Sequence, residues 1–355
     1  MQAQLDIEAT SHTDTPSMPT PSQSTIEVPP SPFLPGTDIQ FAWDSTSLGY
    51  IKTCPRLYQL IMVEGWAPKD DSVHLRFGQE YHAAIEYYDK LKATGVDHDT
   101  AMELAIKEVF LTTADWDPDT DSRAGKYKNR RTLLQLLVDY FDMFANDPAE
   151  TFILDNGKPA VELSFKFELG WGPKAGYLDE HTAPIGDDIG ALRFPYLLCG
   201  HLDRVVRFNN DLYVLDHKTT TTTPSAYFFD GFNPHNQMTL YTFASQVVYH
   251  APVKGVIVEA AQIKLTEPNE FQRGVTYRTQ DQLDEWVSDL EFWLAQAESF
   301  AEAHYWPMND TACDKFGGCM FRDICSKSPA VRDRWLAGDF TKKPAEERWN
   351  PLKPR

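Results

Sequence analysis

The chain has 355 residues, of which 42% are hydrophobic and 13% aromatic, and its formal net charge is −19. Length and composition indicate a globular protein with a sizeable core. The charge argues against tight non-specific binding to nucleic acids, which depends on a basic surface. A local DNA-binding groove is still compatible with it, because charges more than about 8–10 Å apart are largely screened at physiological salt.

Neither membrane insertion nor secretion is expected. The apolar runs fall short of the roughly 18 residues that span a membrane. The start of the chain, MQAQLDIEAT, lacks the basic and apolar regions of a secretory signal. We therefore expect a soluble cytoplasmic protein with no membrane partner.

The composition divides the chain into three segments. The first segment, residues 1–38, is rich in Pro, Ser and Thr and lacks Lys and Arg. This composition predicts disorder, because such a segment cannot bury a core. The second contains the predicted helices and strands. The segments are a tail at 1–38, a domain at 39–330 (a helical part at 44–150, an α/β core at 155–305 and a cysteine lobe at 306–330 that includes Cys54) and a C-terminal extension at 331–355.

The first half of the domain predicts helices. Residues 44–63 indicate two short helices separated by a Cys-Pro break. Residues 72–93, 99–111 and 131–146 predict longer helices, and the first and last of these have apolar residues at helical spacing. The apolar faces consist of Phe77, Tyr81, Ile85 and Tyr88 in 72–93, and of Leu133, Leu137, Tyr140 and Phe144 in 131–146.

The middle of the chain predicts strands. Residues 160–168 alternate between apolar and polar side chains, which is typical of a half-buried strand. Residues 196–208 and 211–217 predict two further strands. The Asn209-Asn210 pair between them predicts the tight turn of a hairpin.

The remaining pattern completes an α/β core. Residues 235–250 predict a helix, and 255–264 and 272–277 predict strands. Thr279-x-x-Gln282 predicts a capping box that opens a long helix ending near residue 303. The order of elements predicts an α/β core wrapped by an α-rich insertion. The buried side of the long helix is expected to consist of Leu283, Trp286, Leu290, Trp293 and Ala297.

The hairpin contains the most informative residues, Gly200-His-Leu-Asp203 and Asp216-His-Lys218-Thr219. Each strand is expected to end with an acid near the sheet edge, and a carboxylate there is costly unless it is paired or binds a cation. Two such acids suit Mg²⁺ or Mn²⁺. Lys218 lies on the same face as Asp216 and is placed to orient or activate a water, as phosphodiester hydrolysis requires. The alternative is a surface hairpin with a salt bridge between Lys218 and one aspartate, and D-x-K alone favours it.

Two further features support a catalytic interpretation. His82 follows Gly78 on a predicted helix and adjoins Tyr81, so it is a candidate third metal ligand, although a lone histidine on such a helix is more often structural. Gln237 and Tyr241 share one face of the following helix because they are four residues apart. Ordinary helix packing is the alternative for this pair.

Cysteines form a second candidate site. Cys313, Cys319 and Cys325 lie in thirteen residues, and Cys54 lies far upstream. In a reducing cytoplasm such a set indicates metal binding before disulfides. Four thiolates of this kind hold either an iron–sulphur cluster or Zn²⁺. Cys199 is most simply a small core residue.

The motifs G-x-x-x-H, G-x-x-D, D-x-K-T and Q-x-x-x-Y, in this order, resemble the RecB-type branch of the PD-(D/E)XK nuclease superfamily over residues 44–326. Ser45-Thr-Ser, Tyr50 and Cys54-Pro-Arg-Leu-Tyr58 resemble the start of that domain. The resemblance implies a restriction-endonuclease-like core, a mixed sheet flanked by helices, with an α-rich N-terminal insertion and a cysteine-ligated C-terminal lobe. The implied roles are metal binding by His82, Asp203, Asp216 and the main-chain carbonyl of His217, activation of water by Lys218, and DNA contact or support of the site by Gln237 and Tyr241.

The same resemblance extends to the iron–sulphur members of that branch, in which one cysteine precedes the nuclease core and three follow it. It implies that a [4Fe–4S] cluster is bound by Cys54, Cys313, Cys319 and Cys325. Many of those members have C-x2-C-x5-C, whereas the first gap here is five residues. Zn²⁺ therefore stays open as an alternative.

A basic run precedes the helix at 131–146. Such a run is usually a solvated helix start, but near an active site it can bind phosphates. The candidate DNA-binding residues are Arg123, Lys126, Lys128, Arg130 and Arg131.

The function favoured by these patterns is a Mg²⁺- or Mn²⁺-dependent deoxyribonuclease, an exonuclease or end-processing enzyme. It would act on single strands or duplex ends in recombination, repair or mobile-element DNA metabolism. The alternatives are a nucleic-acid-binding or assembly protein with little catalysis and a cysteine-bound Zn²⁺ scaffold. No helicase P-loop is present in the sequence, so an unwinding partner would be a separate helicase or recombination protein.

Overall fold

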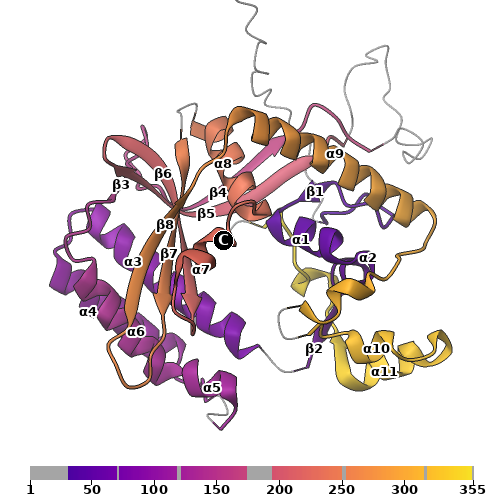
Figure 1. The fold of residues 1–355 in the computed structure, drawn as a ribbon, viewed down its shortest axis with the longest axis horizontal. Helices are drawn as coiled ribbons and strands as arrows, with labels where there is room; N and C mark the ends of the chain where they lie inside the picture. Colours follow the sequence, from indigo (N-terminus) through magenta and orange to yellow (C-terminus); the bar gives the residue numbers. More distant parts are fainter. Residues whose placement is uncertain are drawn as a thin grey trace, which may run out of the picture. The chain divides into compact units, whose positions relative to one another are not determined.

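The computed structural model describes residues 31–69, 72–117, 121–173, 194–249, 253–315 and 318–353. A seven-stranded mixed sheet forms the core of this part of the chain (Figure 1). Its strands are β1 (Ala42–Trp43), β3 (Glu150–Thr151), β4 (Val161–Glu168), β5 (Leu197–Phe208), β6 (Asp211–Thr220), β7 (Val253–Gln262) and β8 (Glu270–Thr276). Strands that are neighbours in the order β1-β5-β6-β7-β8 are hydrogen-bonded to each other, and β3 and β4 also pair with β5. The predicted α/β core with a mixed sheet is therefore confirmed.

The β5–β6 hairpin has the predicted two-residue turn. Asn209 and Asn210 have φ values of 50° and 67°, which a tight hairpin turn requires and which asparagine tolerates. The strand prediction was too short at the other end, since β6 continues to Thr220 as the parallel partner of β7. Asp216 consequently lies inside a central strand and not at a strand end, and the expectation that both acids lie near the sheet edge was wrong. A parallel partner forty residues away in the chain leaves no local signal.

Strand β5 has different partners along one of its sides. At Leu197 and Leu198 it pairs with both β4 and β1, and at Arg204 it pairs with both β4 and β6. Because β4 occupies one side throughout, β1 and β6 share the other side. The segment between Leu198 and Arg204 has neither of these two strands beside it. This gap contains Asp203.

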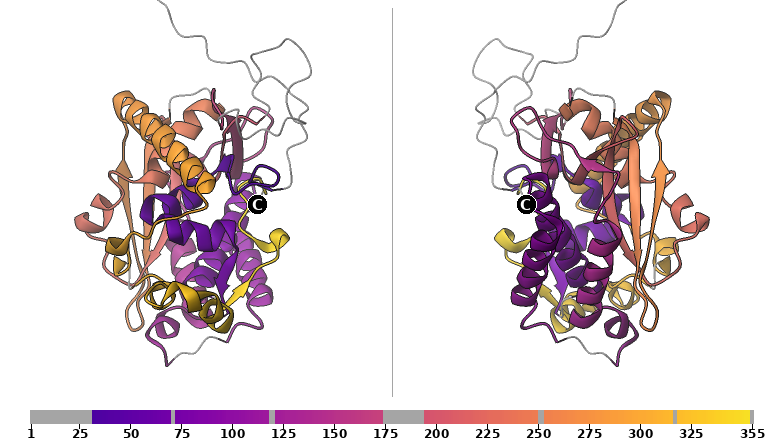
Figure 2. Two further views of the ribbon diagram at one scale, coloured as in Figure 1. Left: turned by 90° about the vertical axis from the view of Figure 1, so that its right-hand side faces the viewer. Right: turned by 90° about the vertical axis from the view of Figure 1, so that its left-hand side faces the viewer.

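One helical layer packs against the sheet through β7 (Figures 1 and 2). The predicted apolar faces form this contact: Phe77, Tyr81, Leu133 and Leu137 are fully buried in one cluster with Ala261. Phe144 is only partly buried, because the helix ends before it. The helices of this layer are α3 (Val73–Ala93), α4 (His98–Thr112), α5 (Arg123–Tyr127) and α6 (Arg130–Met143).

A second group of helices packs on the other large core cluster. The predicted Cys-Pro break is confirmed, as is the capping box of Thr279. The predicted burial of Trp293 in the long helix was wrong: Trp293 is partly exposed, and Leu294 is buried instead. The next buried residue after Leu290 lies four positions on, about one helical turn. No helix among the described residues is long and apolar enough to cross a membrane. This group contains α1 (Ser45–Thr53), α2 (Pro55–Tyr58), a π-helical turn (Gln59–Val63), α7 (Ala226–Asp230), α8 (Asn236–Tyr249) and α9 (Gln280–Glu302).

The N-terminal boundary of the ordered domain lies earlier than predicted. Residues 1–30 are outside the described residues, but 31–38 belong to the fold. Leu34 is 3% exposed, and its N–H donates to the Ile39 carbonyl at 2.8 Å. The expectation of a tail up to residue 38 was therefore too long, because a single buried leucine in a proline-rich segment was not recognised.

The C-terminal segment folds back on the start of the domain and is not a separate extension. Strand β9 (Phe340–Lys342) pairs antiparallel with β2 (Trp66–Pro68). Trp349 Nε1 donates to Asp44 Oδ2 at 2.8 Å. The remaining short elements are α10 (Arg322–Cys325), α11 (Arg332–Asp339) and 3₁₀ turns at Asp310–Ala312, Pro329–Val331 and Ala345–Glu347.

The pairing of β2 with β9, here called the clasp, joins the two ends of the domain. Phe340→Ala is expected to destabilise this clasp. Phe340 is 8% exposed and stacks on Phe321 with ring centroids 4.6 Å apart. Removing a buried ring of this kind lowers the free energy of unfolding by about 3 kcal/mol. Urea unfolding of Phe340→Ala beside Phe292→Ala, whose ring is 60% exposed, measures the effect. Equal midpoints for both variants would contradict a stabilising clasp.

Candidate functional site

The two predicted catalytic aspartates meet where β5 and β6 separate. The ladder between these strands ends at the pair Arg204 and Leu215, which are the chain neighbours of Asp203 and Asp216 on the side of the turn. Beyond this point the N–H of His217 donates to Asp203 Oδ2 at 3.1 Å, so a side chain replaces the missing strand–strand hydrogen bond.

Helix α3 brings His82 to this point. Its Nδ1 lies 3.2 Å from Asp203 Oδ2. Burial by itself lowers the pKa of His82, but the charge and hydrogen bond of Asp203 outweigh it and raise the pKa. Burial raises the pKa of Asp203, yet His82, His217 and Lys218 together lower it well below the usual range. Asp203 is therefore a stable anion at neutral pH.

Asp216 is in a different environment. It is 1% exposed, and its Oδ2 lies 2.6 Å from Lys218 Nζ. The same oxygen is buried and accepts no well-aligned hydrogen bond from the described residues. Burial raises the pKa of Asp216, Lys218 offsets part of this effect, and Asp203 raises the pKa further. Asp216 is thus only partly compensated by positive charge.

Helix α8 holds Lys218 from the other side. Lys218 Nζ donates to Gln237 Oε1 at 3.1 Å, and Gln237 Nε2 donates to the Tyr241 hydroxyl at 2.8 Å. Within the predicted i, i+4 pair, Gln237 therefore contacts the lysine directly, and Tyr241 contacts Gln237. The ammonium lies between a carboxylate and an amide oxygen, which fixes its position.

Comparison with known proteins shows the family of the chain. Residues 45–326 match the PD-(D/E)XK nuclease superfamily. The chain belongs to this superfamily. No protein of curated function matches the sequence. A crystal structure titled as a putative exonuclease from Eubacterium rectale is similar with a TM-score of 0.42 and 10% identity, covering 78% of this chain and 86% of that chain.

A divalent cation fits the donor atoms at this site. Asp203, Asp216 and His82 supply oxygen and nitrogen donors, and the buried Oδ2 of Asp216, which has an ion pair with Lys218 but no well-aligned hydrogen bond from the described residues, is an atom that a cation would satisfy. Among the described residues, no three His, Cys, Asp or Glu side chains form a complete metal-binding group as they stand. The two carboxylates instead contact His82 and Lys218.

The four predicted cluster cysteines line a single cavity of about 160 Å³ between the two ends of the domain. All are free thiols: Cys54, Cys313, Cys319 and Cys325. Burial raises the pKa of Cys313, and the neighbouring thiols Cys319 and Cys54 raise it further. Among the described residues these cysteines do not form a complete metal-binding group as they stand. Cys199 lies elsewhere, 1% exposed in the core, as predicted.

The five basic residues predicted to bind DNA do not form one surface. Lys128 is 7% exposed, donates to Thr219 Oγ1 at 3.2 Å and lies over the Phe77 ring. Arg130 donates to the Phe110 carbonyl at 2.8 Å. These two cations are therefore engaged within the protein. Exposed side chains of the run are Arg123, Lys126 and Arg131.

Sequence reasoning missed a buried ionic network beside the site. Glu259 lies within the apolar strand Val256-Ile257-Val258-Glu259-Ala260-Ala261 and contacts His217 Nδ1 at 2.9 Å. Burial raises the pKa of Glu259, but His217 and Arg273 lower it to about 2. The available signal was a charged residue within the apolar run 256–261, since such a charge must be paired.

Proposed function

We propose that the protein is a metal-dependent DNA nuclease whose catalytic residues are Asp203, Asp216 and Lys218. The observation that carries this proposal is the contact of 2.6 Å between Lys218 and the buried Asp216 at the gap between β5 and β6. A surface salt bridge, the alternative interpretation, would be solvent-exposed, whereas Asp216 is 1% exposed. Membership of the nuclease superfamily supports the same conclusion.

The roles follow from the contacts. Asp203, Asp216 and His82 would hold Mg²⁺ or Mn²⁺ with help from the main-chain carbonyl of His217. When bound, the cation supplies positive charge against the charge that develops on the phosphate. Lys218, held by Gln237, orients the attacking water and stabilises its developing negative charge.

A digestion assay tests the proposal. Purified protein is incubated with end-labelled single- and double-stranded DNA in Mg²⁺, Mn²⁺ or EDTA. We expect cleavage that requires the metal, with a product ladder that reveals exonuclease action at DNA ends. A folded, metal-supplied protein that cleaves neither substrate would favour a binding or assembly role instead, in keeping with the acidic net charge of −19.

We also propose that the chain belongs to the RecB-type branch and binds a [4Fe–4S] cluster through Cys54, Cys313, Cys319 and Cys325. The support is that all four line one cavity although Cys54 is far from the others in sequence. Iron and acid-labile sulphide assays on anaerobically purified protein, together with the visible absorption spectrum, distinguish a cluster from the alternative, Zn²⁺.

The biological setting proposed for this activity is the processing of DNA ends in recombination, repair or mobile-element metabolism in the cytoplasm. Unwinding is proposed to come from a separate helicase or recombination protein. Of the basic run, the exposed Arg123, Lys126 and Arg131 are proposed to contact phosphates.

Gln237→Ala is expected to lower kcat about tenfold with little change in KM for DNA, because it frees Lys218 without removing it. Steady-state kinetics on a labelled oligonucleotide measure both constants. Gln246→Ala on the same helix is the control, because residue 246 is outside the contacts of Lys218. A rise in KM alone would show that Gln237 binds DNA and does not position the lysine.

A further inference from the structure

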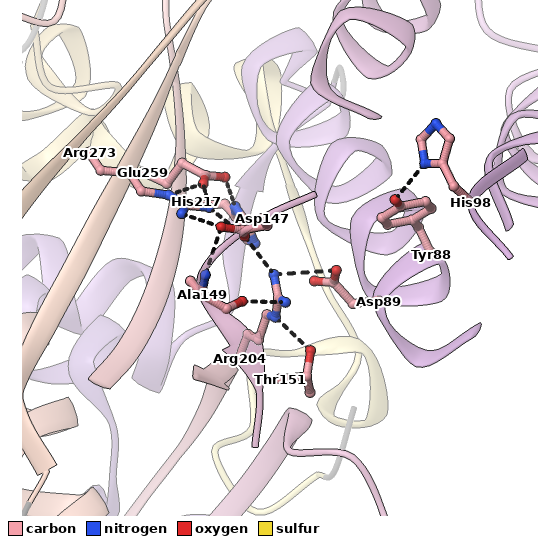
Figure 3. A network of polar contacts seen from close by, with 10 residues as sticks. All are labelled: Tyr88, Asp89, His98, Asp147, Ala149, Thr151, Arg204, His217, Glu259 and Arg273. Atoms are coloured by element: carbon pink, nitrogen blue, oxygen red, sulfur yellow. Dashed lines mark hydrogen bonds and ion pairs between the residues drawn. The ribbon is translucent and has the colours of Figure 1, made fainter. Parts of the chain in front are cut away.

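Buried charged side chains from β5, β6, β7, β8 and α3 form a network beside the candidate site (Figure 3). Glu259 Oε1 on β7 lies 2.9 Å from His217 Nδ1 on β6, and Glu259 Oε2 accepts from Arg273 Nε on β8 at 2.6 Å. Arg273 donates through its two terminal nitrogens to both oxygens of Asp147, at 2.6 and 2.7 Å. Three neighbouring elements of the sheet and the loop after α6 are thereby joined.

Arg204 extends this network to β5 and α3. Its Nη1 lies 3.6 Å from Asp147 and 3.4 Å from Asp89. Its remaining donors bind Thr151 Oγ1 at 2.9 Å and the Ala149 carbonyl at 3.0 Å. Arg204 is therefore bound through all three nitrogens of its guanidinium group. The whole network alternates carboxylates and guanidinium groups.

A gain in folding stability does not by itself explain why these charged side chains are buried together. The side chain of Glu259 has no solvent exposure, and those of Arg204, Asp89 and Asp147 are below one tenth exposed. Burying charges costs about as much as their pairing returns, so an apolar core of the same volume would be equally stable. A fully hydrogen-bonded network does, however, fix the positions of the elements that carry it.

The elements fixed in this way are those that carry the proposed metal ligands. On each of the two catalytic strands, the residue that follows the aspartate belongs to the network. On the helix, the network residue lies about two turns beyond the histidine and so on the same face. The pairs are Asp216 and His217 on β6, Asp203 and Arg204 on β5, and His82 and Asp89 on α3.

We propose that this ionic network sets the spacing of the metal ligands and that Glu259 is its central positioning residue. The inference rests on the proposed metal-dependent function. Glu259 anchors the ring of His217, whose backbone N–H in turn holds Asp203. Strand alternation places the His217 ring on the opposite face from Asp216 and Lys218, so Glu259 acts without touching the substrate.

Glu259→Gln tests this role, because it keeps the shape of the side chain and removes its charge. Mn²⁺ binding is measured by electron paramagnetic resonance without DNA, and kcat and KM are measured with DNA. We expect Mn²⁺ affinity and kcat each to fall by about 10- to 100-fold, as for residues that support metal ligands. KM for DNA is expected to stay within about twofold.

Two controls separate positioning from loss of stability. Lys254→Gln removes an ion pair with Asp211 across the same two strands, at 2.5 Å but exposed and at their far end. Val109→Ala lowers stability from a buried position on α4 outside the network. All proteins are assayed at a temperature where circular dichroism shows them folded. Both controls are expected to bind Mn²⁺ and cleave DNA like the wild type.

The outcomes are distinct. Folded Glu259→Gln with wild-type Mn²⁺ affinity overturns the positioning role. If Glu259→Gln does not fold, the Mn²⁺ affinity of Arg273→Lys is measured instead, and a wild-type value overturns the positioning role. Arg273→Lys keeps the charge but loses the bidentate contact with Asp147. A wild type that binds Mn²⁺ but cleaves no DNA refutes the nuclease, while the Mn²⁺ comparison still decides the network. A wild type that binds no Mn²⁺ overturns both.

Discussion

Lys218→Ala is expected to reduce DNA cleavage by about 10²–10⁴-fold, the usual effect of removing a group that assists proton transfer or charge stabilisation. The chain should stay folded, because the Lys218 side chain is 28% exposed and lies outside the core. Single-turnover cleavage of a labelled oligonucleotide in saturating Mg²⁺ measures the rate. Lys166→Ala, on an exposed position of β4, is the control.

Asp216→Asn distinguishes catalysis from stability at the same site. Cleavage should fall at least as far, because the variant loses a charged metal ligand. Since burial raises the pKa of Asp216, its ionised form destabilises the metal-free fold at neutral pH. Asp216→Asn in EDTA should therefore melt at the wild-type temperature or above it. This gain should vanish below the ordinary value of 3.8, where the carboxyl group is protonated in both states.

The residual cleavage rate of Lys218→Ala decides whether Lys218 is catalytic. A residual rate within tenfold of the wild type in Lys218→Ala would mean that Lys218 only compensates the charge of Asp216. In that case Lys218→Ala should still be less stable than the wild type in EDTA, because Asp216 would lose the only ion pair that the described residues give it.

If the proposed cluster is bound, Cys54→Ala is expected to abolish its binding and to lower the melting temperature by about 10 °C or more, because the cluster would close a very long loop of the chain. Cys54 is 8% exposed and lies between α1 and α2, whereas the other three cysteines follow α9. Iron content and thermal unfolding under anaerobic conditions measure both effects. Losing one thiolate of four removes the link between the two ends of the domain.

Cys199→Ala is the matched control for this experiment. Cys199 is also buried, 1% exposed, but lies in the hydrophobic core away from the cavity. Its loss should lower the free energy of unfolding by about 1 kcal/mol and leave the iron content unchanged. Should Cys54→Ala retain its metal and melt like the wild type, the clasp formed by β2 and β9 alone would account for joining the two ends.

The patterns that predicted the fold well are those set by neighbouring residues. The apolar stripe of α3, the capping box of α9 and the left-handed Asn209-Asn210 turn depend on short-range geometry and appear where the sequence placed them. The contact between Asp216 and Lys218 follows from strand alternation. These features need no knowledge of distant segments.

Other features arise only from segments far apart in the chain. The short strand β1 replaces β6 beside β5, and β9 returns to β2. The burial of Lys128 against Phe77 removed a residue from the predicted DNA-binding run. Each depends on pairings that a local pattern cannot specify, because many distant partners offer the same apolar surface or open strand edge.

The sequence by itself determined the α/β class, the D-x-K hairpin and the candidate ligands, because residue type and periodicity set helices, strands and the face of each side chain. Only the tertiary structure decided that the strands separate at Asp203, that four cysteines share one cavity, and that Glu259 and Arg273 lie behind the site. The physical reason is that pKa values, ion pairs and cavities depend on burial, and burial depends on how the whole chain packs.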